Sequence, residues 1–157
     1  MRVFRNRKET EPDSTRWCLW RWLDITDRDT DYLTRLTIFR CPWFGVMLHW
    51  IHAPDPIEDL HDHPWPFVGV VIDGSYTEVV ATPEDDKLIN GHYNHVTNLI
   101  KKTDPTEAHS IIAVDRAVTL VLAGSHRRDW SFFTPLGNKC PGQGDCRSIT
   151  TPWRDRI

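Results

Sequence analysis

The sequence has no long hydrophobic run. No stretch of its 157 residues approaches the roughly 20 apolar residues that a membrane-spanning helix needs, so we expect no membrane partner. The basic segment from Met1 to Lys8 has no apolar run behind it, and we expect no signal peptide. These observations predict a cytoplasmic protein.

Cysteine is scarce, and the four cysteines form no CxxC pair. In the absence of a secretory signal we expect a reducing compartment and free thiols, including Cys18 and Cys41. Cys140 and Cys146 flank a turn-rich segment and could bridge or share a metal, but two sulfurs lack the other two ligands of a structural zinc site. We therefore interpret this segment as a loop with incidental thiols.

The sequence also lacks a strongly basic region. The net charge is 19 − 22 = −3, and residues 29–123 carry six basic and fourteen acidic side chains, a balance of −8. A nucleic-acid groove in this central part would be opposed by the negative field. We therefore expect no nucleic-acid partner.

Segments that could hold a long amphipathic helix are few as well, because eleven prolines and eight glycines interrupt the chain at short intervals. Between them lie nine short runs rich in β-branched and aromatic residues: 16–25, 32–39, 43–52, 65–72, 75–81, 95–101, 108–114, 117–123 and 130–134. Such runs at this spacing predict an all-β sandwich or barrel. Leu33, Leu36 and Phe39 also fit a helical period, so a helix is the alternative for residues 29–39.

The clearest local signal is a dipeptide between two of these runs. Asp73-Gly74 readily takes the positive φ of a tight turn, so we expect a β-hairpin there. The later run 118–122 is apolar at both parities and should be a central strand.

Histidine is abundant, and seven of the eight histidines fall between positions 49 and 109. His61 and His63 stand just before an expected strand, and alternate residues of an extended chain point to the same side, so both imidazoles can face one point. His109 opens a later apolar run and is the best third ligand. These residues predict a site for a divalent metal, with coordination positions left open for water or substrate.

The other histidines are weaker candidates. His49 and His52 lie three apart on one expected strand and therefore face opposite sides. His49 could point inward as a fourth ligand or a supporting group, although a bond to backbone is the favoured interpretation. His92 and His95 follow Asn90-Gly91, which predicts a turn, and nothing nearby completes a zinc site, so we expect an exposed loop.

Several segments together resemble the cupin superfamily. They are His61-Asp62-His63-Pro64-Trp65, Asp73-Gly74-Ser75-Tyr76-Thr77-Glu78, His109-Ser110-Ile111 and Trp130-Ser131-Phe132. The similarity is greatest to small uncharacterised cupins of phages and bacteria that carry an HDHPW motif. It covers roughly residues 43–135 and implies a double-stranded β-helix, the cupin jelly roll, with a metal at its mouth. We expect a single domain over 1–157 with an extra N-terminal strand region, located in the host cytoplasm if the chain is phage-encoded.

The fit to the cupin pattern has gaps that affect the ligand set. Asp55, Thr106 and Ala113 stand where the pattern has two glycines and an asparagine. The family's glutamate ligand falls at Phe67, which cannot bind a metal. Either the three histidines suffice, as in some thiol dioxygenase-like cupins, or Glu78 takes part. Glu78 could equally be a supporting base or a surface residue.

The resemblance and the histidines together predict a small metalloenzyme. Three neutral ligands leave a divalent ion with its full charge, which suits a small anionic substrate. Iron would favour dioxygenase chemistry, whereas zinc, nickel or manganese would favour isomerase or hydrolase chemistry. Tyr76 and Glu78 are the candidate catalytic acid–base residues. The candidate ligand-binding side chains, for stacking and anion binding, are Trp65, Arg127, Arg128 and Trp130.

Two other functions stay open. One is a non-catalytic cupin that binds or sequesters a small metabolite or nucleotide. The other is an interaction protein in which the barrel serves only as a scaffold. The two arginines follow Gly124-Ser125-His126, so a solvated turn is an equally good interpretation of them.

The N-terminal run 17–23 predicts a homodimer. It is apolar at both parities, so both faces of this strand need cover. Pairing of an open edge strand across a two-fold axis would provide it. Burial of the strand inside its own barrel is the alternative.

Overall fold

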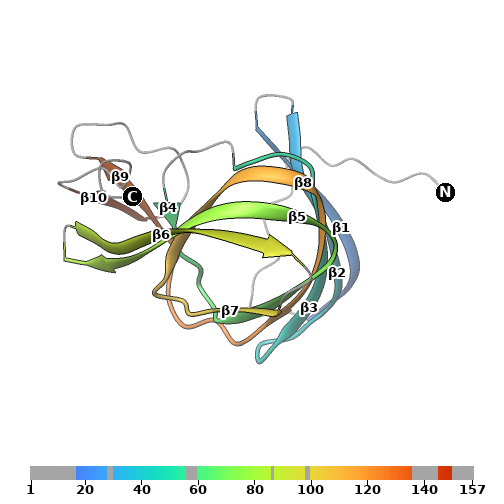
Figure 1. Ribbon diagram of the computed structural model, residues 1–157. Coiled ribbons are helices and arrows are strands. Elements are labelled where there is room, and N and C mark those ends of the chain that lie inside the picture. Colours follow the sequence, from blue (N-terminus) through green and yellow to red (C-terminus); the bar gives the residue numbers. More distant parts are fainter. Residues whose placement is uncertain are drawn as a thin grey trace.

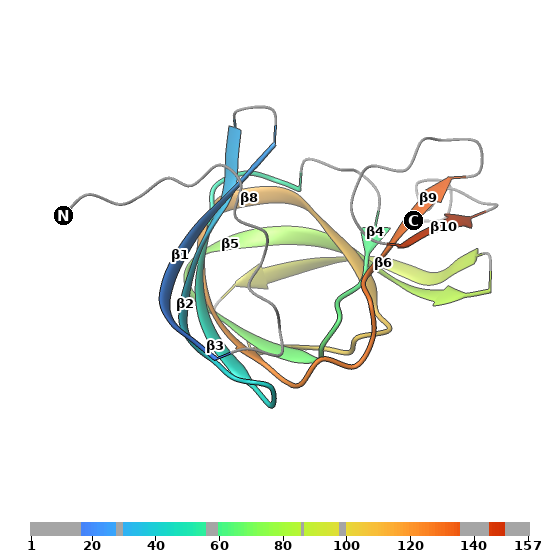
Figure 2. The same cartoon turned by 180° about the vertical axis from the view of Figure 1, so that it is seen from behind.

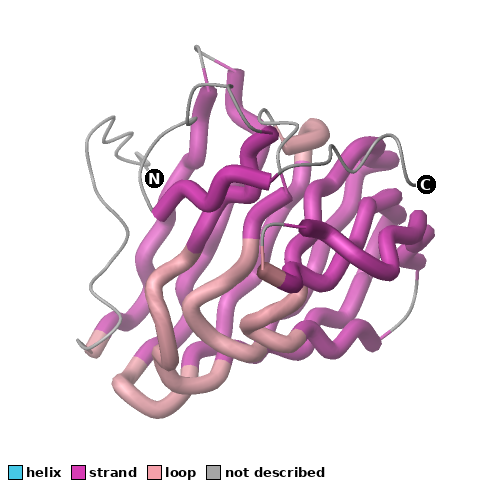
Figure 3. The backbone as a smooth tube through the Cα atoms, turned by 90° about the vertical axis from the view of Figure 1, so that its left-hand side faces the viewer, coloured by secondary structure: helices cyan, strands magenta, loops and turns pink. Residues whose placement is uncertain are grey.

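The computed structural model describes residues 17–27, 30–55, 60–85, 87–97, 100–135 and 145–149, the side chains of 26, 27, 30, 31, 135 and 145–149 excepted. Every regular element in these ranges is a strand (Figure 3). The described residues therefore contain no helix of the length and apolarity needed to cross a membrane. Cys140 and the side chain of Cys146 lie outside the described residues, and the backbone of Cys146 belongs to the last strand.

Ten strands are described, and the prediction of an all-β fold is confirmed. They are β1 (Cys18–Asp27), β2 (Thr30–Arg40), β3 (Gly45–Ile51), β4 (Leu60–His61), β5 (Phe67–Glu84), β6 (Lys87–Thr97), β7 (Ile100–Thr103), β8 (Ala108–Ala123), β9 (Ser131–Pro135) and β10 (Asp145–Ile149). Two pairs of expected strands have each merged into one long strand, β5 and β8. The run 32–39 lies within β2, so the strand prediction holds there against the helical period.

The two long strands organise the whole sheet. β5 and β8 pair antiparallel, from Phe67 opposite Ala123 to Ala81 opposite Ala108. The first half of β5 also pairs with β7, and the second half of β8 continues through β3 and β2 to β1; we call this the first sheet region. The second half of β5 pairs with β6, and the first half of β8 continues through β4 to β9 and the parallel β10, forming the second sheet region. Both regions curl around a common interior (Figures 1 and 2).

The hairpin expected at Asp73-Gly74 is wrong, because β5 runs through this dipeptide without reversing. The register with β8 shifts between Val71 and Asp73 and again between Asp73 and Ser75. Gly74 has a φ of 69°, and a Cβ there would collide with the carbonyl oxygen of Arg116. The positive φ therefore serves a bulge that bends β5 from one sheet region into the other.

The loop expected around His92 and His95 is wrong for a similar reason. Both residues lie on β6, exposed as predicted, and the chain reverses earlier, at Asp85, whose φ is 52°. Asn90 has a φ of 55° and lies next to a register shift between β5 and β6. Here too, a turn-like dipeptide forms a bulge within a strand.

Three clusters of buried side chains fill much of the interior. They are Leu60, Val79, Ala81, Leu88, Ala108 and Phe133; Ile51, Val71, Tyr76, Val96 and Ala117; and Met47, Trp65, Val121 and Ala123. Burying one large apolar side chain stabilises a fold by roughly 1.5–3 kcal/mol, so the clusters hold the two sheet regions against each other. The run 118–122 lies between β3 and β5 as a central strand, as predicted, but its outward-facing Leu122 is exposed.

β1 ends the first sheet region and, among the described strands, pairs with β2 alone. Leu19 and Trp20 are 66% and 69% exposed, and the neighbouring Trp17 is equally exposed. Trp22 stacks on Trp50 of β3 with ring centroids 5.3 Å apart and is still exposed. The alternative in which this strand is buried inside its own barrel is therefore wrong.

Candidate metal centre

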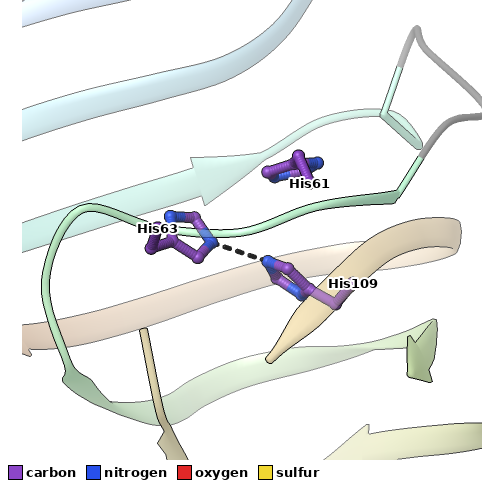
Figure 4. Close-up of side chains that lie close together, drawn as sticks. All are labelled: His61, His63 and His109. Atoms are coloured by element: carbon purple, nitrogen blue, oxygen red, sulfur yellow. Dashed lines mark hydrogen bonds between the residues drawn. The ribbon is translucent and has the colours of Figure 1, made fainter. Parts of the chain in front are cut away.

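Three histidines from neighbouring segments meet in the second sheet region. His61 ends β4, His63 lies between β4 and β5, and His109 is near the start of β8. Because β4 pairs with β8, His61 is opposite His109. The three imidazoles lie together (Figure 4), with one nitrogen of each within 4.8 Å of the others and with His63 Nε2 2.7 Å from His109 Nε2. This group could hold a metal ion.

Asp62 explains why His61 and His63 point to the same side. Its carboxylate is completely buried, accepts a 2.6 Å hydrogen bond from the backbone N–H of Ser131 and lies 2.9 Å from the guanidinium of Arg128. Its own N–H donates to the Ser131 carbonyl (3.1 Å). Since successive side chains of an extended chain alternate, anchoring Asp62 toward β9 directs both histidines the other way.

Backbone hydrogen bonds fix the segment that follows His63. The N–H of Arg127 donates to the Pro64 carbonyl (2.7 Å), and the N–H of Gly124 donates to the Pro66 carbonyl (2.8 Å). The segment after β8 thus holds the entry to β5, and proline suits this position because it has no N–H to donate to a sheet.

Glu78 contacts the Nδ1 atom of His109, whereas the Nε2 atom of His109 lies against His63. Its Oε2 lies 2.8 Å from His109 Nδ1, while Oε1 accepts hydrogen bonds from Lys101 Nζ (2.5 Å) and Asn94 Nδ2 (3.0 Å). A carboxylate at Nδ1 keeps the imidazole proton on that nitrogen and leaves Nε2 as the metal-binding atom. Glu78 is 0% exposed, so the surface-residue alternative is wrong.

Burial and neighbouring charges shift the pKa values of Glu78, His61 and His63. Burial alone would raise the pKa of Glu78, but the hydrogen bond and charge of His109 and the charge of Lys101 outweigh it and lower this pKa to about 2. Burial lowers the pKa of His61 to about 4, although the charge of Asp55 opposes the shift. Burial and the two neighbouring imidazoles hold the pKa of His63 well below its usual range. Neutral imidazoles near pH 7 are in the form that binds metal.

Two further side chains that the sequence predicts for the site are Tyr76 and Trp130. Tyr76 is buried in the cluster near the bend of β5, and burial together with the charges of Glu78 and Asp55 raises the pKa of its hydroxyl. It therefore stays protonated at neutral pH and can act as a donor. Trp130 is 38% exposed, with its ring centroid 6.5 Å from that of His61, so it borders the histidines on a solvent-accessible side.

Trp65 and the two arginines have other surroundings. Trp65 belongs to the cluster around Met47, and the guanidinium of Arg40 lies 4.0 Å above its ring, which covers that face. Arg128 forms the ion pair with Asp62 and donates a 3.4 Å hydrogen bond to the Pro105 carbonyl. The side chain of Arg127 is exposed.

No motif in the sequence pointed to three side chains that contact Glu78 or His49. Lys101 lies on β7 opposite Gly69, and Asn94 lies on β6 opposite Glu78, so both approach through strand pairing rather than through a motif. Arg35 lies on β2 opposite His49, and its Nε donates a 3.0 Å hydrogen bond to His49 Nε2. His49 thus bonds a side chain, not the backbone as favoured above. Burial, and to a smaller extent the charge of Arg35, lowers the pKa of His49 well below the usual range.

Phe67 and His52 complete the set of predicted positions. The ring of Phe67, which stands where the cupin pattern has its glutamate, is 5.0 Å from the ring of His63 at an interplanar angle of 87°. The residue at the glutamate position therefore faces the histidine group. His52 follows β3, with Nε2 3.0 Å from Thr34 Oγ1 and outside the group.

No protein-family model matches the sequence, and no curated protein matches it either. Solved structures do share the architecture. A cupin-2 domain from Rhodospirillum rubrum superposes with a TM-score of 0.53 at 11% sequence identity, covering 83% of this chain and 81% of that domain. The fold is a cupin barrel. A cupin 2 conserved barrel domain protein from Rhodopseudomonas palustris gives a TM-score of 0.53 at 12% identity, over 73% of this chain and 78% of that one.

An enzyme structure is similar to the same degree. Fe(II)-HppE with the alternative substrate (S)-1-HPP gives a TM-score of 0.51 at 13% identity and covers 72% of this chain. The match covers only 65% of the HppE chain, so this chain spans less than two thirds of the length of that enzyme. At these identities the shared property is the fold, and the finer resemblance to HDHPW cupins of phages and bacteria stays a prediction.

Proposed function

We propose that this protein is a metal-dependent cupin enzyme in which His61, His63 and His109 bind one divalent ion. The observation that carries the proposal is the convergence of three imidazoles, two of them held neutral by burial, with Glu78 behind the third. Iron, zinc, nickel and manganese all suit an imidazole site with open positions. HppE, whose barrel is similar, is described with Fe(II), which makes iron the first metal to test.

The ligand set supports a small anionic substrate. When bound, a divalent ion would supply Lewis acidity or, in the case of iron, a centre for dioxygen chemistry. The three-histidine group contains no carboxylate, so nothing within it offsets the charge of an ion. Phe67 adds an apolar wall beside His63.

The surrounding side chains have distinct proposed roles. Glu78 is a positioning residue, because its oxygens are engaged by His109, Lys101 and Asn94. Tyr76 stays protonated and is the candidate proton donor. Trp130 borders the histidines and would pack against a substrate, while the exposed Arg127 could bind an anion at the rim.

Metal analysis of purified protein tests this proposal. Wild type should contain about one divalent ion per chain, and the double variant His61→Ala/His63→Ala should contain none, with an unchanged β-type circular dichroism spectrum. His95→Ala is the matched control, since it removes an exposed histidine on β6, and it should retain the metal. A double variant that kept its metal would contradict the ligand assignment.

A second measurement separates the enzyme from the non-catalytic alternative. Iron-loaded protein should consume dioxygen when it is supplied with its substrate. Separately, mass spectrometry of denatured protein identifies any small molecule that the purified protein carries. A co-purifying metabolite or nucleotide that is released unchanged, without turnover under any metal, would favour a binding protein instead.

A further inference from the structure

The three histidines come from two segments of the chain that share little backbone pairing. His61 and His63 lie on one segment, and His109 lies on the other, 46 residues after His63. Among the described residues, β4 pairs with β8 through His61 and His109 alone. A metal site needs its ligand atoms held in a fixed arrangement, so contacts beyond this pair have to keep the two segments together.

Arg128 contacts both segments. Its Nη2 lies 2.9 Å from Oδ2 of Asp62, which stands between the two histidines of the first segment. Its Nη1 donates a 3.4 Å hydrogen bond to the carbonyl of Pro105, which lies four residues before the histidine of the second segment. The backbone N–H of Arg128 also donates to the carbonyl of Pro64, at 3.4 Å, directly after the first segment's second histidine. One arginine therefore links the two segments that carry the histidines.

The contact between Arg128 and Asp62 is an ion pair inside the protein. The side chain of Asp62 is completely buried, and that of Arg128 is 24% exposed. A buried carboxylate needs a counter-charge, and a guanidinium is always charged and presents several donors in a fixed plane. Arginine can therefore contact Asp62 and the Pro105 carbonyl at the same time, whereas lysine has a single ammonium on a flexible stem.

We propose that Arg128 is a positioning residue of the metal centre, which holds the segment of His61 and His63 against the segment of His109. The inference rests on the proposed function, because it concerns the ligands of the proposed ion. Asp62 points toward β9, away from the side that its two neighbouring histidines face. Arg128 therefore acts from behind the ligands and does not touch the substrate.

Zinc affinity, measured by competition with a chelator under conditions in which the protein is folded, tests this proposal. Arg128→Gln removes a positive charge, and that change alone would favour a bound cation. Loss of the link between the segments has the opposite effect, so we expect zinc affinity to fall about 10-fold with an unchanged circular dichroism spectrum. Lys102→Gln is the matched control, since it removes one exposed positive charge from β7, and it should bind zinc as wild type does. Unchanged or higher affinity in Arg128→Gln overturns the proposal.

Two further variants separate positioning from a general loss of stability. Arg128→Lys keeps a counter-charge for Asp62 but cannot also reach the Pro105 carbonyl, so it should bind zinc several-fold more weakly than wild type. Wild-type affinity in Arg128→Lys would show that the charge alone suffices and would overturn the link. Asp62→Asn/Arg128→Gln should lose no more affinity than Arg128→Gln, because both changes break the same contact. Losses that multiply would show that the two residues act independently and would also overturn the link.

The outcomes separate this inference from the proposed function. A wild type that binds no zinc overturns the proposed function. A wild type that binds zinc, with Arg128→Gln binding it equally well, overturns only the role of Arg128. If Arg128→Gln does not fold, Asp62→Asn/Arg128→Gln decides, because it leaves neither charge of the pair without its partner. A zinc affinity about 10-fold below that of wild type supports the proposal in this double variant, and wild-type affinity overturns it.

Discussion

Glu78 contacts three side chains at once, and each contact affects the histidine group. It is completely buried, holds His109 through Nδ1 and neutralises Lys101, which is itself nearly buried. Charge and geometry are therefore coupled at this residue: the carboxylate that orients a metal-binding imidazole is also the counter-charge of a buried ammonium.

We expect Glu78→Gln to weaken metal binding by about 10- to 100-fold, because an amide no longer fixes the proton on His109 Nδ1. Among the described side chains Lys101 would keep only Glu107, 3.6 Å away, as a counter-charge, so the substitution should also lower the free energy of unfolding by about 2 kcal/mol. Competition with a chelator measures the first effect and urea unfolding the second. Asn94→Ala removes one hydrogen bond from the same carboxylate but keeps its charge, and should cost about 1 kcal/mol. Unchanged metal affinity in Glu78→Gln would show that Glu78 does not support metal binding.

Phe67 provides a second test at the scale of one residue. Replacing it by glutamate should add a fourth ligand beside His63, strengthen metal retention and weaken anion binding, because a carboxylate in contact with the ion offsets its charge. Calorimetric titration of a small dicarboxylate into metal-loaded wild type and Phe67→Glu measures the change. Phe67→Gln is the neutral control and should retain anion binding. Equal anion affinity in wild type and Phe67→Glu would show that residue 67 does not reach the metal.

Among the strands, β5 links the two sheet regions because each half of it pairs within one of them. Its two interior glycines have opposite surroundings. Gly74 sits at the bend with a positive φ and with the carbonyl oxygens of β8 where a Cβ would stand, whereas Gly69 has almost no neighbour at that place. The bend is what turns the second half of β5, with Glu78, toward the histidines.

These surroundings predict opposite effects of the same substitution. Gly74→Ala should destabilise the protein by at least about 2 kcal/mol, since alanine is strained at positive φ and its Cβ would collide with Arg116. Gly69→Ala should be neutral or stabilising by up to about 1 kcal/mol, because the added methyl meets no obstacle and the unfolded chain loses freedom. Chemical unfolding of both variants checks the prediction. Equal stability of the two would mean that the bend does not depend on Gly74.

For the molecule as a whole, the exposed aromatic residues around β1 suggest a contact surface. The ring of Trp17 lies edge-on to those of Phe39 and Trp43, with centroids 5.6 and 6.2 Å away, and Trp43 is also exposed. An exposed edge strand with apolar side chains is a common place for two copies of a chain to pair. Among the described strands nothing pairs with the outer edge of β1, and on this ground we propose the homodimer that the sequence predicts.

We expect light scattering to give the mass of two chains at micromolar concentration. Leu19→Lys places a charge on the exposed edge strand and should yield a monomer. Ile100→Lys is the matched control, since Ile100 is 74% exposed on β7, at the other margin of the first sheet region, and it should leave the dimer intact. A wild type with the mass of one chain would refute the dimer, and a monomeric Ile100→Lys would move the interface away from β1.

The all-β class and the joint orientation of His61 and His63 could be predicted without the structure. Both depend on local properties: prolines and glycines leave few stretches that could form a long helix, and alternate residues of an extended chain share a side. The same reasoning extended to His109, which begins an apolar run, and the cupin resemblance supplied the barrel that joins them.

Where the chain turns and what surrounds the histidines depend on contacts between distant strands, which the sequence does not reveal. Asp73-Gly74 and Asn90-Gly91 have the composition of tight turns, but a positive φ serves a bulge equally well, and pairing with distant strands selects the bulge in both places. Lys101 reaches Glu78 because β7 pairs with the first half of β5, and Arg35 reaches His49 because β2 pairs with β3. Strand order and register arise from contacts between residues far apart in the chain, so no local pattern of residues records them.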